Sequence, residues 1–247
     1  MGLMQVIITT KNLAQSFFTK LSDVILPPKC LCCSESVGQQ GTICGTCFSG
    51  LNVIGKHKCH KCGLPFQFDM GEKALCQACS MQKPRYDIVR AYCTYEKIGA
   101  DMAIKLKFSD KTHLAPYMAK MLNIAGSSLL GKVDAIAPIP LYHTRKLRRK
   151  YNQAALLAQN LARISGIKYE PFLLKRTRNT KKQTTLPKNL RMKNMEGAFT
   201  VNKNFAGKKI LLVDDVMTTG ATINAAAVAL KDTGVKKVYG LVFARVE

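Results

Sequence analysis

Four Cys-x-x-Cys pairs lie in the first third of the chain and constrain its folding more than any other feature. They use eight of the ten cysteines: Cys30/Cys33, Cys44/Cys47, Cys59/Cys62 and Cys76/Cys79. Two thiolates that are two residues apart can bind one metal ion, and two such pairs supply the four sulfurs of a tetrahedral zinc site. The sequence therefore predicts two structural zinc ions, each enclosed by sulfur with no open position for catalysis.

Which cysteine pairs share an ion is left open by the sequence. Sequential pairing joins the first two pairs at one site and the last two at the other, and an interleaved arrangement is the alternative. Zinc is favoured because residues 29–80 are polar, rich in glycine and unable to order without cross-links. Three alternatives to zinc are disulfides, a thioredoxin-like redox pair and an iron–sulfur cluster. Disulfides would need an export signal, and none is visible. A redox pair would need a single Cys-x-x-Cys on a βαβ unit, not four in a row.

Residues 1–26 predict a short amphipathic helix rather than a signal peptide. Apolar side chains recur there at roughly helical spacing, among them Phe17, Phe18, Leu21, Val24 and Ile25. Polar residues interrupt the apolar stretch, and no small-residue cleavage site follows it. The chain has no run of about 18 apolar residues that could span a membrane. We therefore expect a cytoplasmic protein, where thiols stay reduced for zinc.

Positive charge is concentrated in the second half of the chain. The formal net charge is +23, and residues 136–209 hold 18 Lys or Arg against two acids, Glu170 and Glu196. A field of this sign attracts polyanions such as nucleic acid, pyrophosphate or an anionic membrane surface. An ordinary solvated basic surface is the alternative.

Residues 209–234, KILLVDDVMTTGATINAAAVALKDTG, carry the most specific chemical signal. Residues 210–213 are a continuous apolar run, which is typical of a strand buried on both faces of a parallel sheet. Asp214 and Asp215 follow at its carboxyl end, where ligands bind in open α/β sheets. A hydroxyl-rich loop, residues 218–222, then leads into a predicted helix over residues 223–231, with Gly234 as a stop signal.

This acidic pair and this loop suit the two ends of a sugar phosphate. Backbone N–H groups at a helix start bind an anion, threonine hydroxyls add donors, and Gly220 lets the backbone turn. Two carboxylates repel phosphate but accept hydrogen bonds from vicinal hydroxyls. The segment is neither a Walker A loop nor Gly-x-Gly-x-x-Gly. It predicts a ribose beside Asp214 and Asp215 and a 5′-phosphate in the loop.

The remaining elements predict an α/β fold with a mainly parallel sheet flanked by helices. Residues 133–139 and 238–243 read as strands, and residues 102–108, 114–130 and 152–164 read as helices. A basic loop follows the strand at 133–139, and a polar, basic stretch spans residues 176–199. The second stretch is long and has little periodicity, so it could be a lid that closes over a pyrophosphate, with a solvated loop as the alternative, whereas the first is a loop suited to anions. The candidate pyrophosphate and lid residues are Arg145, Arg149, Lys150, Lys182 and Arg191.

The segment at 210–222 closely resembles the signature of type I phosphoribosyltransferases. The resemblance implies that the two acids hold the ribose hydroxyls of 5-phosphoribosyl-1-pyrophosphate (PRPP) and that the loop holds its 5′-phosphate, with Mg²⁺ on the pyrophosphate. The implied PRPP-binding residues are Asp214, Asp215, Val216, Met217, Thr218, Thr219, Gly220, Ala221 and Thr222, the first two being the candidate catalytic residues.

Taken together, the chain resembles the ComF (GntX-like) family, in which a double zinc ribbon precedes a phosphoribosyltransferase domain. The resemblance is carried by LSDVILPPKC at 21–30, CHKCGLP at 59–65, IKLKF at 104–108, PIPLYHTRKLRRKYNQAALLA at 138–158 and the 210–222 motif. One departure is Arg149-Lys150, where the family commonly has Arg-Gly before an aromatic-Asn-Gln triplet. A lysine there alters the backbone freedom of the loop.

The resemblance implies three parts: an N-terminal helix at 1–26, a double zinc ribbon at 27–84 and a phosphoribosyltransferase domain at 85–247. It implies a cytosolic role in DNA uptake during natural transformation, with single-stranded DNA and a competence helicase as partners. Two functions stay open. One is a phosphoribosyltransferase, a glycosyl-transferring enzyme for which no general base or acceptor pocket is evident. The other is a non-catalytic PRPP-sensing adaptor that binds DNA or a helicase partner.

Overall fold

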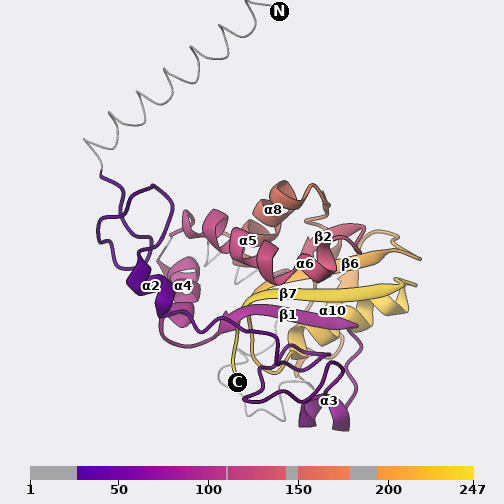
Figure 1. Cartoon of the computed structure of the whole chain (residues 1–247). Coiled ribbons are helices and arrows are strands. Elements are labelled where there is room, and N and C mark those ends of the chain that lie inside the picture. The colour runs from indigo at the N-terminus through magenta and orange to yellow at the C-terminus, as the bar shows by residue number, and fades with distance from the viewer. Residues whose placement is uncertain (1–26, 110, 143–149, 179–193) are drawn as a thin grey trace, which may run out of the picture. The chain divides into compact units, whose positions relative to one another are not determined.

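The computed structural model describes residues 27–109, 111–142, 150–178 and 194–247, and Figure 1 traces the whole chain. The chain divides into two compact units, one ending at Phe48 and the other running from Ser49 to Glu247. The predicted helix at 1–26 lies outside the described residues. The predicted boundary after residue 84 stays a prediction, although the third and fourth cysteine pairs fold in the same compact unit as the sheet.

The described part of the first unit is built around the first two cysteine pairs. Lys29 and Ser36 form an antiparallel bridge across the turn that carries the first pair. The backbone N–H of Leu31 donates to the carbonyl of Thr42 (3.0 Å), which draws the second pair towards the first. Helix α2 (Gly45–Ser49) starts between the two cysteines of the second pair. So short a segment depends on a metal cross-link to hold its shape.

A five-stranded sheet in the order β1-β7-β6-β2-β3 forms the centre of the second unit (Figure 1). Its strands are β1 (Ile88–Thr94), β2 (Ala135–Pro138), β3 (Lys168–Tyr169), β6 (Lys209–Met217) and β7 (Lys237–Arg245). Every neighbouring pair is parallel, which confirms the predicted α/β fold. The central strands β6 and β7 are near-continuous apolar runs because both faces of the sheet are covered.

Helices cover the two faces of this sheet. They are α4 (Lys97–Phe108), α5 (Leu114–Ala125), α6 (Ser127–Leu130), α8 (Gln153–Ser165) and α10 (Ala221–Asp232), and α3 (Gln77–Met81) belongs to the fourth cysteine pair. Adjacent residues of β7 face opposite layers: Leu241 contacts Gly126 at the end of α5, and Gly240 faces Ile223 of α10. Figure 1 shows α5 and α8 on one side of the sheet and α10 on the other.

The ends of the helices follow local signals in the sequence. The side chain of Asn152 caps α8 by accepting a hydrogen bond from the N–H of Ala154 (3.1 Å), and the helix ends at Gly166, whose φ is 71°. The helix predicted over 114–130 is instead divided into α5 and α6, because the chain turns at Gly126 (φ −89°, ψ 0°).

Strand β6 is longer than the sequence predicts. It continues to Met217, which pairs with Arg245 of β7, so that Asp214 and Asp215 lie within the strand rather than after it. Strand β1 is not evident from the pattern, because Arg90 interrupts its apolar run. Pairing with β7 therefore decides both where β6 ends and that residues 88–94 form a strand.

Two short antiparallel strands pair with each other at the two ends of the basic stretch at 176–199. Strands β4 (Leu174–Arg176) and β5 (Phe199–Val201) pair with each other, and the N–H of Thr177 donates to the carbonyl of Ala198 (3.0 Å). Within the described ranges, every helix is too short or too polar to serve as a membrane span.

Candidate functional site

Cysteine sulfurs gather at two places in the described part of the chain. Within each group the four Sγ atoms lie within 4.8 Å of one another. One group is Cys30, Cys33, Cys44 and Cys47, and the other is Cys59, Cys62, Cys76 and Cys79. The pairing is therefore sequential, which is one of the two arrangements compatible with the sequence. We call these groups the first and the second zinc site.

The spacing of the sulfurs fits zinc. The Sγ atoms of Cys33 and Cys44 are 3.6 Å apart, and those of Cys62 and Cys76 are also 3.6 Å apart. Four Zn–S bonds of about 2.3 Å at tetrahedral angles place the sulfurs about 3.8 Å apart. Since sulfur occupies all four corners, each site is suited to hold a structural zinc ion rather than a catalytic one.

Backbone N–H groups surround both zinc sites, but the sites differ in burial. The N–H of Cys44 donates to Cys30 Sγ (3.2 Å), and the N–H of Cys76 donates to Cys59 Sγ (3.3 Å). Burial alone raises the pKa of Cys30, but the N–H donors around its sulfur outweigh burial and lower the pKa to about 6. All four cysteines of the second site are buried, whereas Cys33 of the first is exposed.

Strand β6 carries the predicted acidic pair to the carboxyl edge of the sheet. The N–H of Asp215 donates to Oδ1 of Asp214 (2.9 Å), and the N–H of Val216 donates to Oδ1 of Asp215 (2.8 Å). Asp215 is 9% exposed and Asp214 is half-buried. A carboxylate has about four lone-pair sites, so these bonds leave acceptor capacity for the hydroxyls of a ligand.

The two carboxyl groups interact unfavourably in the absence of a ligand. Burial and the charge of Asp215 raise the pKa of Asp214 well above its ordinary value. The N–H of Asp215 and the positive charge of Lys107 act in the opposite direction. A ligand that donates hydrogen bonds to the pair, or brings a cation to it, relieves the repulsion. The pair is therefore suited to vicinal hydroxyls and to a hard cation such as Mg²⁺.

Residues 218–222, which the sequence predicts to bind phosphate and which we therefore call the phosphate loop, lead from β6 into α10. Gly220 is the N-cap of α10 in the left-handed region (φ 80°, ψ 3°). Thr218, Thr219 and Thr222 are partly exposed, and Thr219 Oγ1 accepts a hydrogen bond from the N–H of Ala221 (3.4 Å). The first turn of α10 contains no acidic residue. The positive end of the helix dipole is therefore available to an anion.

The end of α4 and the start of α8 are joined beside the acidic pair. The hydroxyl of Tyr151 donates to the carbonyl of Leu106 (2.7 Å), and Nε2 of Gln153 lies 3.5 Å from the carbonyl of Lys107. These bonds hold the last turn of α4 in place. They fix the position of Lys107, whose charge acts on Asp214.

Among the predicted pyrophosphate residues, only Lys150 lies within the described chain. Its φ is 47°, which is in the left-handed region that favours glycine. The family resemblance implies glycine at this position, and the lysine adopts a backbone conformation that glycine favours. The other four candidates lie outside the described residues: Arg145, Arg149, Lys182 and Arg191.

Three residues beside the site were not predicted from the sequence. Lys107 acts on Asp214 by its charge, and burial together with the charge of Asp215 raises the pKa of Tyr95. The hydroxyl of Tyr86 lies 3.4 Å from the place that a Cβ of Gly220 would occupy. The IKLKF segment is a signal for Lys107. The two tyrosines flank β1, and no local motif reveals them because sheet pairing brings them to the site.

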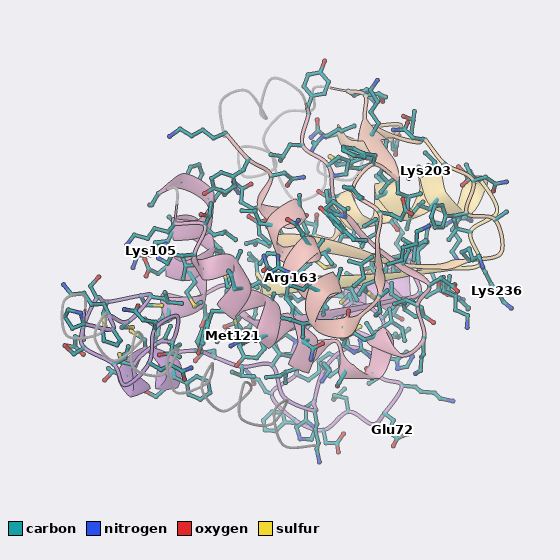
Figure 2. All side chains as sticks on the ribbon, turned by 90° about the horizontal axis from the view of Figure 1, so that it is seen from above. Glu72, Lys105, Met121, Arg163, Lys203 and Lys236 are labelled. Carbon is teal, nitrogen blue, oxygen red and sulfur yellow. The ribbon has the colours of Figure 1, made fainter. Side chains whose placement is uncertain are left out.

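Basic side chains are spread over several elements of the second unit. Figure 2 labels Lys105 on α4, Arg163 on α8, Lys203 after β5 and Lys236 before β7, and these residues point in different directions. Basic residues are therefore not confined to the two basic stretches of the sequence, although Lys105 and Lys203 are ion-paired with Asp101 and Glu170.

Comparison with known proteins identifies both parts of the chain. Residues 21–94 match the double zinc ribbon domain and residues 152–246 match the phosphoribosyl transferase domain. The chain is 34% identical over 188 residues to competence protein F of Haemophilus influenzae, and the alignment covers 73% of this chain and 81% of that protein. The chain belongs to the ComF family.

Other similarities extend over most of this ComF chain. The DNA utilization protein YhgH of Escherichia coli K12 is 29% identical over 216 residues, covering 85% of this chain and 93% of that protein. Among solved structures, the glutamine PRPP amidotransferase of B. subtilis is 18% identical, with a TM-score of 0.39, over 56% of this chain and 30% of that one. The family's order, zinc ribbons followed by a phosphoribosyl transferase domain, is the order of the zinc sites and the sheet here.

Proposed function

We propose that this ComF protein binds PRPP with Mg²⁺ at the carboxyl end of β6 and acts in DNA uptake. One observation carries the proposal: a single short segment brings two adjacent carboxylates and the N-terminus of α10 to the same edge of the sheet. In this proposal Asp214 and Asp215 accept hydrogen bonds from the ribose hydroxyls. The phosphate loop binds the 5′-phosphate, and Val216 and Met217 connect the two subsites.

The pyrophosphate end of the ligand is assigned to the basic residues beside the pair. Lys107 and Lys150 lie in the described chain, on the two sides of the α4–α8 contact made by Tyr151. The other predicted cations, among residues 143–149 and 179–193, belong to the same proposal. Mg²⁺ supplies further positive charge to the diphosphate, since its preferred ligands are phosphate and carboxylate oxygens.

A donor held in this way is suited to substitution at ribose C1. The bond between C1 and the pyrophosphate oxygen breaks, pyrophosphate leaves with the bonding electrons, and the lone pair of an acceptor forms the new bond to C1. Positive charge grows on the ribose ring near Asp214 and Asp215. Negative charge grows on the leaving group, where Lys107 and Lys150 stabilise it, and Mg²⁺ would supply further positive charge.

Calorimetric titration with PRPP, with and without Mg²⁺, tests the binding site. Asp215→Ala should lose binding by at least about tenfold, because a buried ribose hydroxyl loses its acceptor. Asp232→Ala is the matched control, because it removes the same charge from an exposed position at the far end of α10. The proposal fails if the wild-type protein does not bind PRPP, or if both variants bind it as the wild type does.

Release of pyrophosphate distinguishes an enzyme from a sensor. Purified protein is incubated with PRPP, Mg²⁺ and a panel of nucleobases and amines, and pyrophosphate is measured. Release that depends on Asp215 supports a phosphoribosyltransferase. Binding without release from any acceptor supports the second candidate, a PRPP-sensing adaptor for DNA or a helicase. That candidate is favoured by the zinc ribbons, which sugar phosphate chemistry does not need.

The role in DNA uptake is supported by the relatives and by charge. The similar proteins carry the names competence protein F and DNA utilization protein, and the net charge is +23. Binding to a labelled single-stranded oligonucleotide should weaken steeply with salt, because each neutralised phosphate releases counterions. Affinity that does not change between low and physiological salt would contradict direct electrostatic binding.

A further inference from the structure

The second zinc site and the phosphate loop share one buried cluster. Besides the four cysteines of that site, the cluster contains Tyr86, Met217 at the end of β6, and Ala221 and Ile223 in the first turn of α10. We infer that the second zinc site sets the geometry of the phosphate loop through this cluster, with Tyr86 as the positioning residue between them. The inference rests on the proposed function of the loop and adds a way to regulate it.

The phosphate loop rests directly on Tyr86. This tyrosine is 3% exposed, and its Oη and Cε1 lie 3.4 and 3.7 Å from the place of a Cβ at Gly220. Met217 Cε fills the other side of the glycine, 2.5 Å from the same place. A loop that binds phosphate through backbone N–H groups works only while these groups point at one spot. The loop backbone at Gly220 is therefore set by the position of the Tyr86 ring.

Tyr86 is in turn held by the second zinc site. Lys61 lies between two of the zinc ligands, and its Nζ donates to the carbonyl of Tyr86 (2.7 Å). The carbonyl of Lys61 accepts a hydrogen bond from the N–H of Val89 (2.8 Å), and Gly63 approaches the carbonyl of Val89 so closely that a Cβ would lie at 2.9 Å. A metal ion shared by the four sulfurs of the second site would cross-link the knuckle at 59–62 to the one at 76–79 and stabilise the shape that makes these contacts.

A second connection reaches the first turn of α10. The N–H of Arg85 donates to Oδ1 of Asn224 (2.7 Å), and the N–H of Asn224 donates to the carbonyl of Gly220 (2.8 Å). The chain that leaves the second zinc site is thus tied to the residue that caps the helix. Tyr86 and Arg85 are neighbours, so displacement of one displaces the other.

None of these connections, among the residues described, involves the first zinc site. That site belongs to the other compact unit, and its Cys33 is exposed. The two zinc sites have the same set of ligands but should differ in their effect on the phosphate loop. Loss of zinc from the second site should loosen the phosphate loop, and loss from the first should leave it unchanged.

Hydrogen–deuterium exchange without ligand tests the inference independently of PRPP binding. Cys76→Ser removes one ligand of the second zinc site, and Cys33→Ser is the matched control at the first; zinc content is measured for each. We expect amides of residues 218–224 to exchange about tenfold faster in Cys76→Ser and at the wild-type rate in Cys33→Ser. Equal exchange in all three proteins, or equal acceleration in both variants, would overturn the inference.

Substitution of Tyr86 tests the same inference without removing a zinc ligand, and it applies even if Cys76→Ser does not fold. Tyr86→Leu should retain both zinc ions but accelerate exchange at 218–224 and raise the Kd for PRPP by about tenfold. Tyr86→Phe keeps the ring and should restore most of both properties, which a general loss of stability would not do. A Tyr86→Leu protein with wild-type exchange in the loop would overturn the inference. If wild type fails to bind PRPP while exchange responds as expected, only the proposed function is lost.

Discussion

The backbone N–H of Asp215 donates a hydrogen bond to Oδ1 of Asp214 (2.9 Å), which holds two mutually repelling carboxyl groups side by side at the end of β6. The strand continues to Met217, so regular sheet hydrogen bonding fixes the pair in this position. The repulsion is part of the folded state and exists before any ligand binds. The acidic pair is therefore a source of instability, which a ligand that donates hydrogen bonds to it would offset.

Removal of one charge from the pair should stabilise the protein without ligand. Burial and Asp215 raise the pKa of Asp214 in the folded state, whereas the unfolded chain has an ordinary value of about 3.9. The folded state thus binds the proton more tightly, and stability falls as the pH rises from the unfolded to the folded pKa. We expect Asp214→Asn to raise the Tm at pH 7 by a few degrees, for a gain of about 1 kcal/mol, and to weaken PRPP binding.

Thermal unfolding at pH 7 and at pH 4 checks this expectation. The gain from Asp214→Asn should shrink at the lower pH, where the carboxyl group is protonated. Asp232→Asn, at an exposed position, should change the Tm little at either pH. A lower Tm for Asp214→Asn at pH 7 would contradict the assignment of repulsion to this pair.

Gly220→Ala should weaken PRPP binding, whereas alanine at another left-handed glycine should not. Gly166 is the matched control, because its φ of 71° is close to the 80° of Gly220 but no atom lies within 4 Å of its Cβ position. Both alanine variants should lose about 1 kcal/mol of stability from the left-handed conformation. Only Gly220→Ala, which meets Met217 and Tyr86, should weaken PRPP binding in calorimetry. Equal binding by the two variants would show that the loop is not the phosphate site.

Two substitutions of Lys150 distinguish its backbone from its charge. Since φ is 47° at this residue, Lys150→Gly should be more stable than Lys150→Ala by about 1 kcal/mol in chemical denaturation. Both variants lack the ammonium group, so both should bind PRPP more weakly if the side chain contacts pyrophosphate. Alanine as stable as glycine would mean that the left-handed conformation is not kept in solution.

Glu170 should make the folded state sensitive to acid. Its carboxylate is 5% exposed and bound by Lys168 (2.8 Å) and by Lys203 (2.7 Å), which is labelled in Figure 2. Hydrogen bonds from Lys168 and then Lys203 lower its pKa from the ordinary 4.5. The resulting stability is fully present above the unfolded pKa and is lost as the pH falls through the folded pKa.

Glu170→Gln tests this contribution. We expect the substitution to cost about 1–2 kcal/mol at pH 7, because two lysines lose their buried partner, and to cost progressively less below about pH 4. Urea denaturation across this pH range measures the difference from the wild-type protein. A cost that does not change with pH would assign the effect to packing rather than to charge.

Zinc release should occur in two phases. The first zinc site has an exposed cysteine, whereas the second is buried in the core of the larger unit. A chelator with a colorimetric indicator should remove one zinc per chain quickly and the other slowly, because access to the second requires local opening. Cys33→Ser should abolish the fast phase. Release of both ions at one rate would mean that the two sites open together.

The strand–loop–helix arrangement of the candidate site could be predicted from the sequence because its residues are local, whereas their role in binding stays a prediction. Asp214, Asp215 and the phosphate loop follow one another along the chain, and strand, loop and helix each carry their own pattern. The cysteine pairs are local for the same reason, although which pairs share a metal depends on the fold. Asn152 and Gly166 mark the ends of α8 through capping preferences that act within a few residues.

Long-range contacts explain what the sequence could not predict. Strand β1 is recognisable only by its pairing with β7, since Arg90 breaks its apolar run. Tyr86 reaches Gly220 because the chain from the second zinc site passes the first turn of α10. The extension of β6 to Met217 likewise depends on the neighbouring strand. Such contacts are decided by tertiary packing, which overrides local preference.

Strands β4 and β5 lie at the two ends of the basic stretch and pair with each other, so the stretch between them is a closed loop. Each doubling of the length of a closed loop adds only about 0.6 kcal/mol of entropic cost. Insertions or deletions confined to residues 179–193 should therefore hardly affect the folding of the sheet, whereas Met195 and Ala198 are fully buried in its core and constrain the end of the stretch. Natural selection can therefore change the length of the stretch for a new acceptor or partner without rebuilding the core.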